Sequence, residues 1–190
     1  VIQLEESDDN QTTVFQEKGS RYERPYEYKQ LLGSNETKVA YNNPLVVVLD
    51  EDVDAPLLLN QYVKESVELN RPLVILAPDF SKNVISVMIE NFQKTGLKIL
   101  PLVIPGYGDE KQEYYKDIVS IVEGDNISRI VADKFAFTLY TKEFSPTMQK
   151  RSDYLQSQIG QETSLYYKDI MEKRLSIIHQ KVFSIHVGAT

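Results

Sequence analysis

The chain has 190 residues, of which 42% are hydrophobic and 26% charged, the composition of an ordinary globular domain. Its formal net charge of −7 and the lack of a dense basic run argue against a nucleic-acid partner, because contact with phosphates requires a basic patch. The lack of cysteine excludes disulfides and thiolate chemistry, and the longest apolar runs are too short to cross a membrane.

The first forty residues are polar, rich in tyrosine and only weakly periodic. We expect them to form a hairpin at the edge of a sheet, followed by an extended segment. Three apolar runs come next, and each has the length of a buried strand: residues 44–49, 72–77 and 97–104.

Amphipathic helices are predicted between these three strands. The first helix, capped by Asp54 and with Pro56 in its first turn, should run to about Leu69. The second helix should start after Ser81, a good N-cap, and end at Gly96 in a left-handed conformation. Strands that alternate with helices at these spacings predict βαβ units and a partly parallel sheet.

The second half of the chain is predicted to contain shorter strands and longer helices. A turn at residues 105–109 leads into a helix near residues 110–122. The remaining elements, in chain order, are strands at 128–132 and 136–140, two helices within 146–179 that break near Gly160, and a closing strand at 182–187.

No catalytic or metal-binding constellation stands out in the sequence. His179 lies at a predicted helix end and His186 in an alternating strand, so we interpret both as structural. The Gly-Tyr-Gly-Asp run at residues 106–109 follows a strand and precedes a helix, as a phosphate loop does. It lacks the third glycine of a dinucleotide fingerprint and the Gly-Lys-Ser/Thr of a P-loop. We interpret it as a tight turn in which Asp109 caps the next helix.

The first two helices carry more apolar side chains than one buried face needs. On the second helix, Val84, Met88 and Phe92 can face the sheet, while Ile85 and Ile89 form another ridge at its margin. The first helix has a similar surplus, in which Leu59 and Val63 flank a row made by Leu58, Tyr62 and Ser66. This surface is either covered by the C-terminal helices or open as a groove for a partner.

The central part of the chain carries three short motifs: a proline, four apolar residues and Leu-Asp at 44–50, Arg-Pro-Leu-Val-Ile-Leu-Ala-Pro-Asp at 71–79, and Pro-Gly-Tyr-Gly-Asp at 105–109. In these motifs, which match without a gap, the chain resembles the apical domain of group I (GroEL-like) chaperonins. The last motif corresponds to the family's Pro-Gly-Phe-Gly-Asp and is a specific marker at that distance. Weaker similarity extends the resemblance to almost the whole chain, at residues 22–26, 151–173 and 182–190.

The resemblance implies an α/β fold of the GroEL-like apical type (swivelling β/β/α), with a mixed sheet flanked by helices and two C-terminal helices. It implies a single apical, polypeptide-binding domain over residues 1–190. The chain lacks an initiator methionine and stops abruptly, so we expect an excised fragment whose two ends adjoin the intermediate domain. Relative to the family, a stretch after Ser128 is missing.

In that family, non-native polypeptide and the mobile loop of the co-chaperonin bind between two parallel helices and a nearby tyrosine-bearing segment. The matching helices here are residues 55–69 and 82–94. The family's binding positions fall on Tyr22, Tyr26, Glu27, Asn60, Val63, Ile85, Ile89 and Glu90. Glu27, Asn60 and Glu90 replace large apolar residues, which predicts weaker or narrower binding, and ligands whose basic residues pair with Glu27 or Glu90.

The resemblance also implies what a full-length parent would do. The parent is expected to be a ring-shaped chaperonin that hydrolyses ATP with Mg and binds unfolded polypeptides and a co-chaperonin, in the cytoplasm or an organelle matrix. The Gly-Asp-Gly-Thr-Thr signature of the family's ATP site is not in this chain, and the domain that carries it also supplies most ring contacts in the family, so we expect a monomer without cofactor or enzyme activity. The acidic net charge and the short apolar runs predict no nucleic-acid partner and no membrane partner. The alternatives are a small-ligand α/β domain that uses the turn at 105–109, a specialised subunit with a dedicated partner, and a structural descendant whose groove is filled by its own N-terminal segment.

Overall fold

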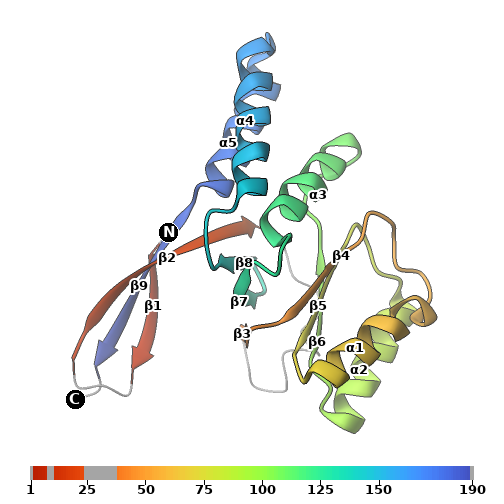
Figure 1. The fold of residues 1–190 in the computed structure, drawn as a ribbon. Coiled ribbons are helices and arrows are strands. Elements are labelled where there is room, and N and C mark those ends of the chain that lie inside the picture. Colours follow the sequence, from red (N-terminus) through yellow and green to blue (C-terminus); the bar gives the residue numbers. More distant parts are fainter. Residues whose placement is uncertain (1, 8–10, 24–37, 189–190) are drawn as a thin grey trace.

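The computed structural model describes residues 2–7, 11–23 and 38–188. These residues form a mixed α/β fold with two sheets, helices around them, and a long ribbon of strands that leaves the body of the molecule (Figure 1). The α/β class predicted from the sequence is therefore confirmed. The extended segment predicted after the first strands lies outside the described residues.

The central sheet is parallel and has three strands in the order β4-β5-β6. Their bounds are Leu45–Val48 for β4, Leu73–Ala77 for β5 and Ile99–Val103 for β6. β5 and β6 are buried throughout, as predicted. β4 is only half-buried along its length, so the buried strand predicted at residues 44–49 is confirmed as a strand but not as fully buried.

The two faces of this sheet pack against different helices. In β5, Leu73, Ile75 and Ala77 belong to one hydrophobic cluster, whereas Val74 and Leu76 belong to another, as the alternation of a strand requires. The covering helices are η2 (Pro56–Leu59), α1 (Asn60–Leu69), α2 (Lys82–Thr95) and α3 (Asp109–Val122). Figure 1 shows α1 and α2 on one side of the sheet and α3 on the other.

The predicted end signals of α2 are confirmed. The hydroxyl of Ser81 accepts a hydrogen bond from the backbone N–H of Val84 at 3.2 Å, which caps the first turn. Gly96 ends the helix with a φ of 68°, a conformation that costs glycine little.

Two other predicted caps are wrong. Asp54 does not cap the first helix, whose N-cap is Ala55, because residues 53–55 run extended beside the start of α2. The hydroxyl of Ser81 donates to the backbone oxygen of Asp54 there, at 3.2 Å. At α3 the N-cap is Gly108, and Asp109 is the first helical residue, where its charge still suits the positive end of the helix.

The second sheet has six strands in the order β1-β9-β2-β8-β7-β3. Their bounds are Ile2–Ser7 for β1, Lys181–Gly188 for β9, Thr13–Glu23 for β2, Ala136–Thr141 for β8, Ile127–Asp133 for β7 and Lys38–Asn42 for β3. The strands predicted at 128–132 and 136–140 are confirmed as β7 and β8, which pair antiparallel with each other. The predicted N-terminal hairpin is wrong, because β9 lies between β1 and β2 and pairs with both.

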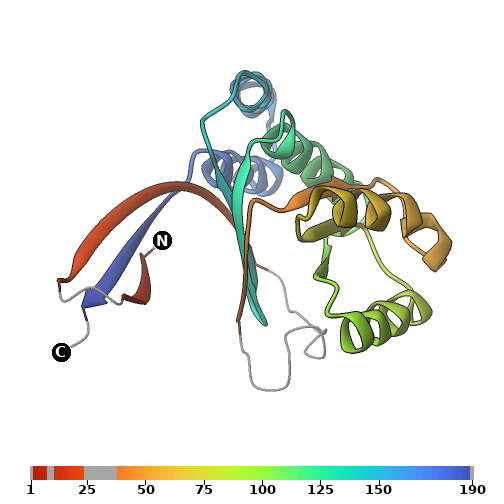
Figure 2. The same ribbon diagram turned by 60° about the horizontal axis from the view of Figure 1, so that its bottom comes forward.

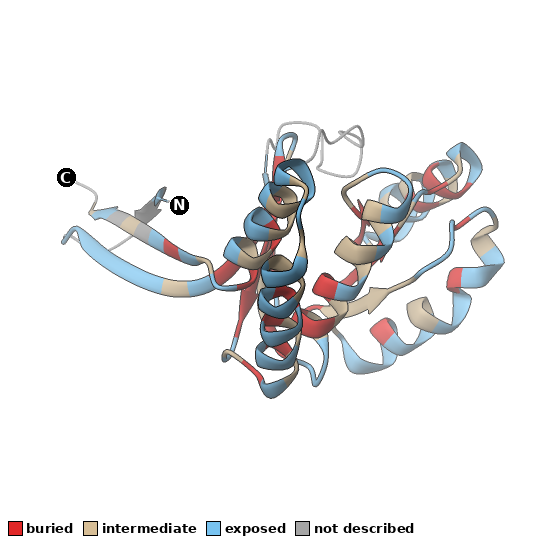
Figure 3. Ribbon diagram, turned by 90° about the horizontal axis from the view of Figure 1, so that it is seen from above, coloured by how far each residue is buried: buried red, intermediate tan, exposed pale blue. Residues whose placement is uncertain are grey.

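The ribbon consists of β1, β9 and the first half of β2. Strand β2 passes from this ribbon into the body of the molecule. Its residues 13–18 pair with β9, and its residues 19–23 pair with β8. At the change of partner, a Cβ on Gly19 would lie 3.1–3.2 Å from side chains of both neighbouring strands, so the close approach requires glycine. Figure 2 shows the ribbon curving away from the body, and Figure 3 shows that it is mostly exposed.

The two C-terminal helices form a hairpin, as predicted. α4 (Pro146–Gln161) is capped by Ser145 and α5 (Leu165–Ile178) by Ser164. The break falls at residues 162–164, just after the predicted one. His179 follows α5, and its Nε2 lies 2.7 Å from the Ser152 hydroxyl of α4, a contact between the helices that fits the structural role predicted for it. The side chain of His186 lies outside the described set.

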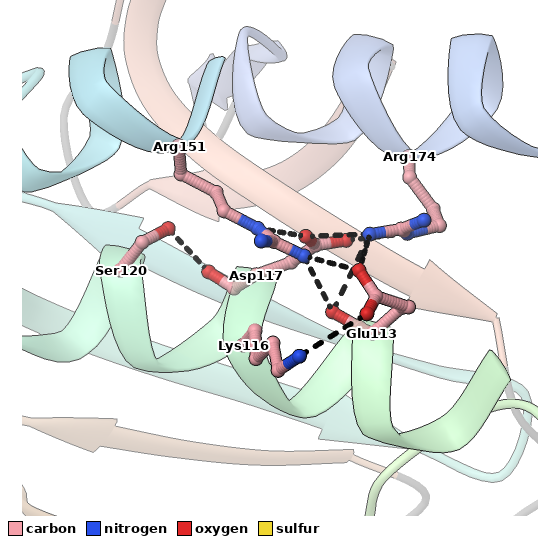
Figure 4. Close-up of polar contacts among 6 residues, drawn as sticks. All are labelled: Glu113, Lys116, Asp117, Ser120, Arg151 and Arg174. Atoms are coloured by element: carbon pink, nitrogen blue, oxygen red, sulfur yellow. Dashed lines mark hydrogen bonds and ion pairs between the residues drawn. The ribbon is translucent and has the colours of Figure 1, made fainter. Parts of the chain in front are cut away.

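A buried ion cluster fastens α3 to both C-terminal helices (Figure 4). The fully buried Asp117 of α3 accepts hydrogen bonds at 2.8 Å from the Nε atoms of Arg151 on α4 and Arg174 on α5. Glu113, one turn earlier, accepts from the same two guanidinium groups at 2.7 and 3.3 Å. Neither the buried Asp117 nor the partly exposed Glu113 was identified from the sequence, because the acidic residues show no pattern that separates buried from solvated ones.

Replacing Asp117 with asparagine should lower the free energy of unfolding by about 3–5 kcal/mol, because Arg151 and Arg174 lose their buried carboxylate partner and keep only the partly exposed Glu113. Chemical denaturation followed by circular dichroism measures this change. The matched control is Asp153→Asn, an exposed carboxylate on α4, which should change stability by less than about 0.5 kcal/mol. Equal losses in the two variants would show that the cluster does not hold the helices together.

Glu113 should make the fold sensitive to acid. Burial opposes ionisation of its carboxyl, but hydrogen bonds from Arg151 and Lys116 outweigh it and hold the pKa of Glu113 below its ordinary value. Its stabilisation is therefore present above the unfolded pKa of about 4.3 and is lost as the pH falls through the lower, folded value. Denaturation curves at decreasing pH should show a steeper acid loss in the native chain than in Glu113→Gln, and identical slopes would contradict this role.

Candidate functional site

The candidate site is the surface formed by α1 and α2. Each helix connects two parallel strands, so the two helices run in the same direction over one face of the sheet. Val63 of α1 and Ile85 and Ile89 of α2 all belong to the hydrophobic cluster on that face. The structure therefore brings these three of the eight sequence-predicted positions together.

The two isoleucines of α2 differ in exposure. Ile89 is half-buried, but Ile85 is only 9% exposed, so its predicted place on a ridge at the margin of the helix is wrong. Ile85 lies within the cluster because η2 packs on α2, which brings Val53 and Leu59 into the same cluster. The accessible apolar edge of α2 consists of Ile89 and the half-buried Phe92.

The 3-10 helix η2 changes only the start of the buried row of the first helix, whereas Tyr62 is half-buried and Ser66 buried, as predicted. The predicted row of Leu58, Tyr62 and Ser66 assumed an α-helix from its first residue. Because the chain enters as a 3-10 helix, Leu59 is buried instead, while Leu57 is 77% and Leu58 51% exposed. The sequence analysis missed these two exposed leucines, since three consecutive leucines after a proline fit either kind of helix.

Polar residues border the apolar edge of both helices. Asn60 is exposed on α1 and shares one side of that helix with Val63 and the exposed Val67, at spacings of three and four residues. Glu90 is exposed on α2 and accepts a hydrogen bond from the ammonium of Lys94, which holds the pKa of Glu90 below its ordinary value. The acidic charge at the site therefore already has a basic partner.

Tyr22 lies in a different part of the molecule. Because β2 pairs with β8, Tyr22 lies opposite Phe137, stacks on its ring at 5.5 Å, and meets Tyr114 edge-on at 6.1 Å. Its hydroxyl is buried without a hydrogen-bond partner among the described residues, and burial raises the pKa of Tyr22 well above its ordinary value. The structure does not bring Tyr22 to the α1–α2 surface. Tyr26 and Glu27 lie outside the described residues.

The turn at residues 105–109 has the geometry of a tight turn. Gly106 and Gly108 have positive φ angles of 92° and 57°. Asp109 and Glu110 already place two carboxylates in the first turn of α3, where a phosphate would have to bind. In the described part of the chain, no group of three or more His, Asp or Glu is arranged to hold a metal ion, and no helix there is long and apolar enough to cross a membrane.

Comparison with known proteins relates the whole chain to one kind of protein. No family model matches it. The chain is 26% identical over 209 residues to chaperonin GroEL of Aster yellows witches'-broom phytoplasma and to chaperonin GroEL of Onion yellows phytoplasma. It is 25% identical over 214 residues to chaperonin GroEL of Orientia tsutsugamushi.

These alignments cover 99–100% of this chain but only 38–39% of each relative, so the chain spans well under half of the length of the proteins it matches. The similarity includes both helices of the candidate site and the turn that follows β6. The resemblance seen in the sequence is confirmed: over its whole length the chain is similar to GroEL chaperonins, at about one identical residue in four.

Proposed function

We propose that this chain is the apical, polypeptide-binding domain of a group I chaperonin, of the swivelling β/β/α type. It binds non-native polypeptide and the mobile loop of a co-chaperonin between α1 and α2. The observation that carries this proposal is the apolar edge of two parallel helices, where Val63, Val67, Ile89 and Phe92 are half-buried or exposed. The similarity of the whole chain to GroEL chaperonins supports it.

Such an edge suits ligands that share no fixed sequence. Burial of apolar surface is favourable without directional contacts, and each leucine-sized side chain that leaves water contributes about 1.5–3 kcal/mol. An unfolded segment with apolar residues at helical or strand spacing can lay them along the groove. Leu57 and Leu58 add exposed apolar surface at the start of α1.

The polar positions of the site narrow the range of ligands. Asn60 and Glu90 stand where large apolar residues were expected, so fewer apolar contacts are available to a general ligand. Glu90 is paired with Lys94 within α2, and an incoming basic residue can take the place of that lysine. We therefore infer a specialised chaperonin subunit, with a preference for apolar segments that also carry a basic residue.

The same proposal extends to the parent protein. We infer that residues 1–190 form one apical domain whose ends adjoin an intermediate domain, and that ATP and Mg act in a further domain of the parent. The parent would assemble as a ring and assist folding in the cytoplasm or an organelle matrix. The chain itself would be a monomer without catalysis, since binding at an apolar edge requires no reacting group.

Ile89→Glu should weaken binding of a short amphipathic apolar peptide at least tenfold, because a charge replaces one apolar contact of the groove. The measurement is a titration of the isotope-labelled chain followed by backbone amide shifts, which should be confined to α1 and α2. Leu165→Glu is the matched control, since Leu165 is 83% exposed on α5, and it should leave the affinity unchanged. Shifts confined to residues 105–110 would instead favour a small-ligand domain.

Glu90→Val should strengthen binding of the same peptide by several-fold and broaden the set of peptides bound, because it removes a charge and adds an apolar contact. Glu90 is exposed, so the fold should be unaffected. The control is Glu65→Val at an exposed position of α1, which measures how much any added apolar side chain increases non-specific peptide binding. An equal gain in both variants, or none in Glu90→Val, would remove the argument for specialisation.

A further inference from the structure

A cleft lies on the far side of the central sheet from the α1–α2 surface. It has a volume of about 550 Å³ and is bounded by the turn after β6, the first turns of α3 and the tip of the α4–α5 hairpin. α3 covers the sheet face opposite the candidate site, so the two surfaces are separate (Figure 1). Nothing in the proposed polypeptide-binding function uses this cleft.

Tyrosines line this cleft from three elements. Tyr107 of the turn is 90% exposed, and Tyr166 and Tyr167 at the start of α5 are 69% and 59% exposed. Tyr154 of α4 is 46% exposed beside them. Large aromatic side chains gathered at one exposed cleft offer flat π surfaces on which a ligand group can stack. Such a gathering is not needed for the core, because these side chains contribute little to it.

The elements that hold the tyrosines are rigid. At Gly106 a Cβ would lie 2.9 Å from the Tyr114 ring and 3.1 Å from the backbone nitrogen of Lys111, so the turn packs tightly on its own helix. The ammonium of Lys111 also donates to a backbone oxygen of the segment after β5 at 2.7 Å. On the other side, the Glu162 carboxylate accepts the backbone N–H of Ser164 at 2.8 Å. A rigid site loses less entropy when a ligand binds.

The cleft carries an excess of negative charge. Asp109, Glu110 and Glu162 line it, and none of them forms an ion pair with a described residue. Arg174 also lines the cleft, but its guanidinium is engaged by Asp117 and Glu113. The N-termini of α3 and α5 each add about half a positive charge, which three carboxylates outweigh. The cleft therefore favours a cation.

We propose that this cleft docks an arginine-bearing segment of a partner polypeptide. A guanidinium is planar, so it can stack on a tyrosine ring while its N–H groups reach carboxylates at the rim. The same pairing occurs inside this chain, where the guanidinium of Arg151 lies 4.9 Å from the ring centroid of Tyr154. Asp109 and Glu110 lie next to Tyr107 in the chain, so stacking and ion pairing are available together.

The test is a titration of the isotope-labelled chain with a capped hexapeptide that carries two arginines among glycines, beside the same peptide with citrulline in place of arginine. Citrulline keeps the shape and removes the charge. We expect saturable amide shifts at residues 107–113 and 162–171 with the arginine peptide, at least about fivefold weaker binding of the citrulline peptide, and weaker binding at high salt.

Variants connect the binding to the cleft. Tyr107→Ser and Tyr166→Ser should each weaken arginine-peptide binding by about two- to fivefold, and Glu110→Gln by a similar factor. Phe135→Ser, an aromatic that is 63% exposed on the β7–β8 turn, should change nothing. Ile89→Glu should also change nothing, which separates this site from the proposed polypeptide-binding groove. Equal binding of the two peptides, shifts confined to α1 and α2, or unchanged affinity in the tyrosine variants would overturn the proposal.

Discussion

Hydrogen bonds from two arginines to one buried carboxylate hold the C-terminal helices against the rest of the molecule. Asp117 comes from the helix that covers the inner face of the parallel sheet, and Arg151 and Arg174 come from the C-terminal hairpin. Desolvating three charged groups is costly, so the arrangement is stable only with all partners present and correctly aligned. It therefore sets where the hairpin lies relative to the sheet, and with it the cleft between α3, α4 and α5.

Much of the fold could be predicted because its signals are local. The cap at Ser81, the left-handed Gly96 and the buried strand β5 each depend on a few neighbouring residues, and all three were found as predicted. The errors arose where the deciding partner is far away in the chain. Nothing within β1 or β2 shows that a strand from the other end lies between them, and nothing beside Asp117 shows that two arginines bury it.

The candidate site was located by resemblance and adjusted by packing. Periodicity placed Ile85 at an exposed margin, but the path of the chain through Val53 and η2 determines that it is buried. Tyr22 was assigned to a binding surface because its segment resembles one, yet its pairing opposite Phe137 places it in the core. A short run of residues predicts its own conformation well. It predicts poorly which distant residues will lie next to it in the folded chain.

The unbroken course of β2 has a mechanical consequence. One half of this strand belongs to the ribbon and the other half to the sheet beside α5, and Gly19 lets both sets of neighbours approach closely at the junction. Backbone hydrogen bonds between antiparallel strands lie across the strand direction, so a pull along β2 loads its bonds to β8 together instead of one after another. A force on the far end of the ribbon therefore reaches the sheet beside α5 through several backbone hydrogen bonds at once.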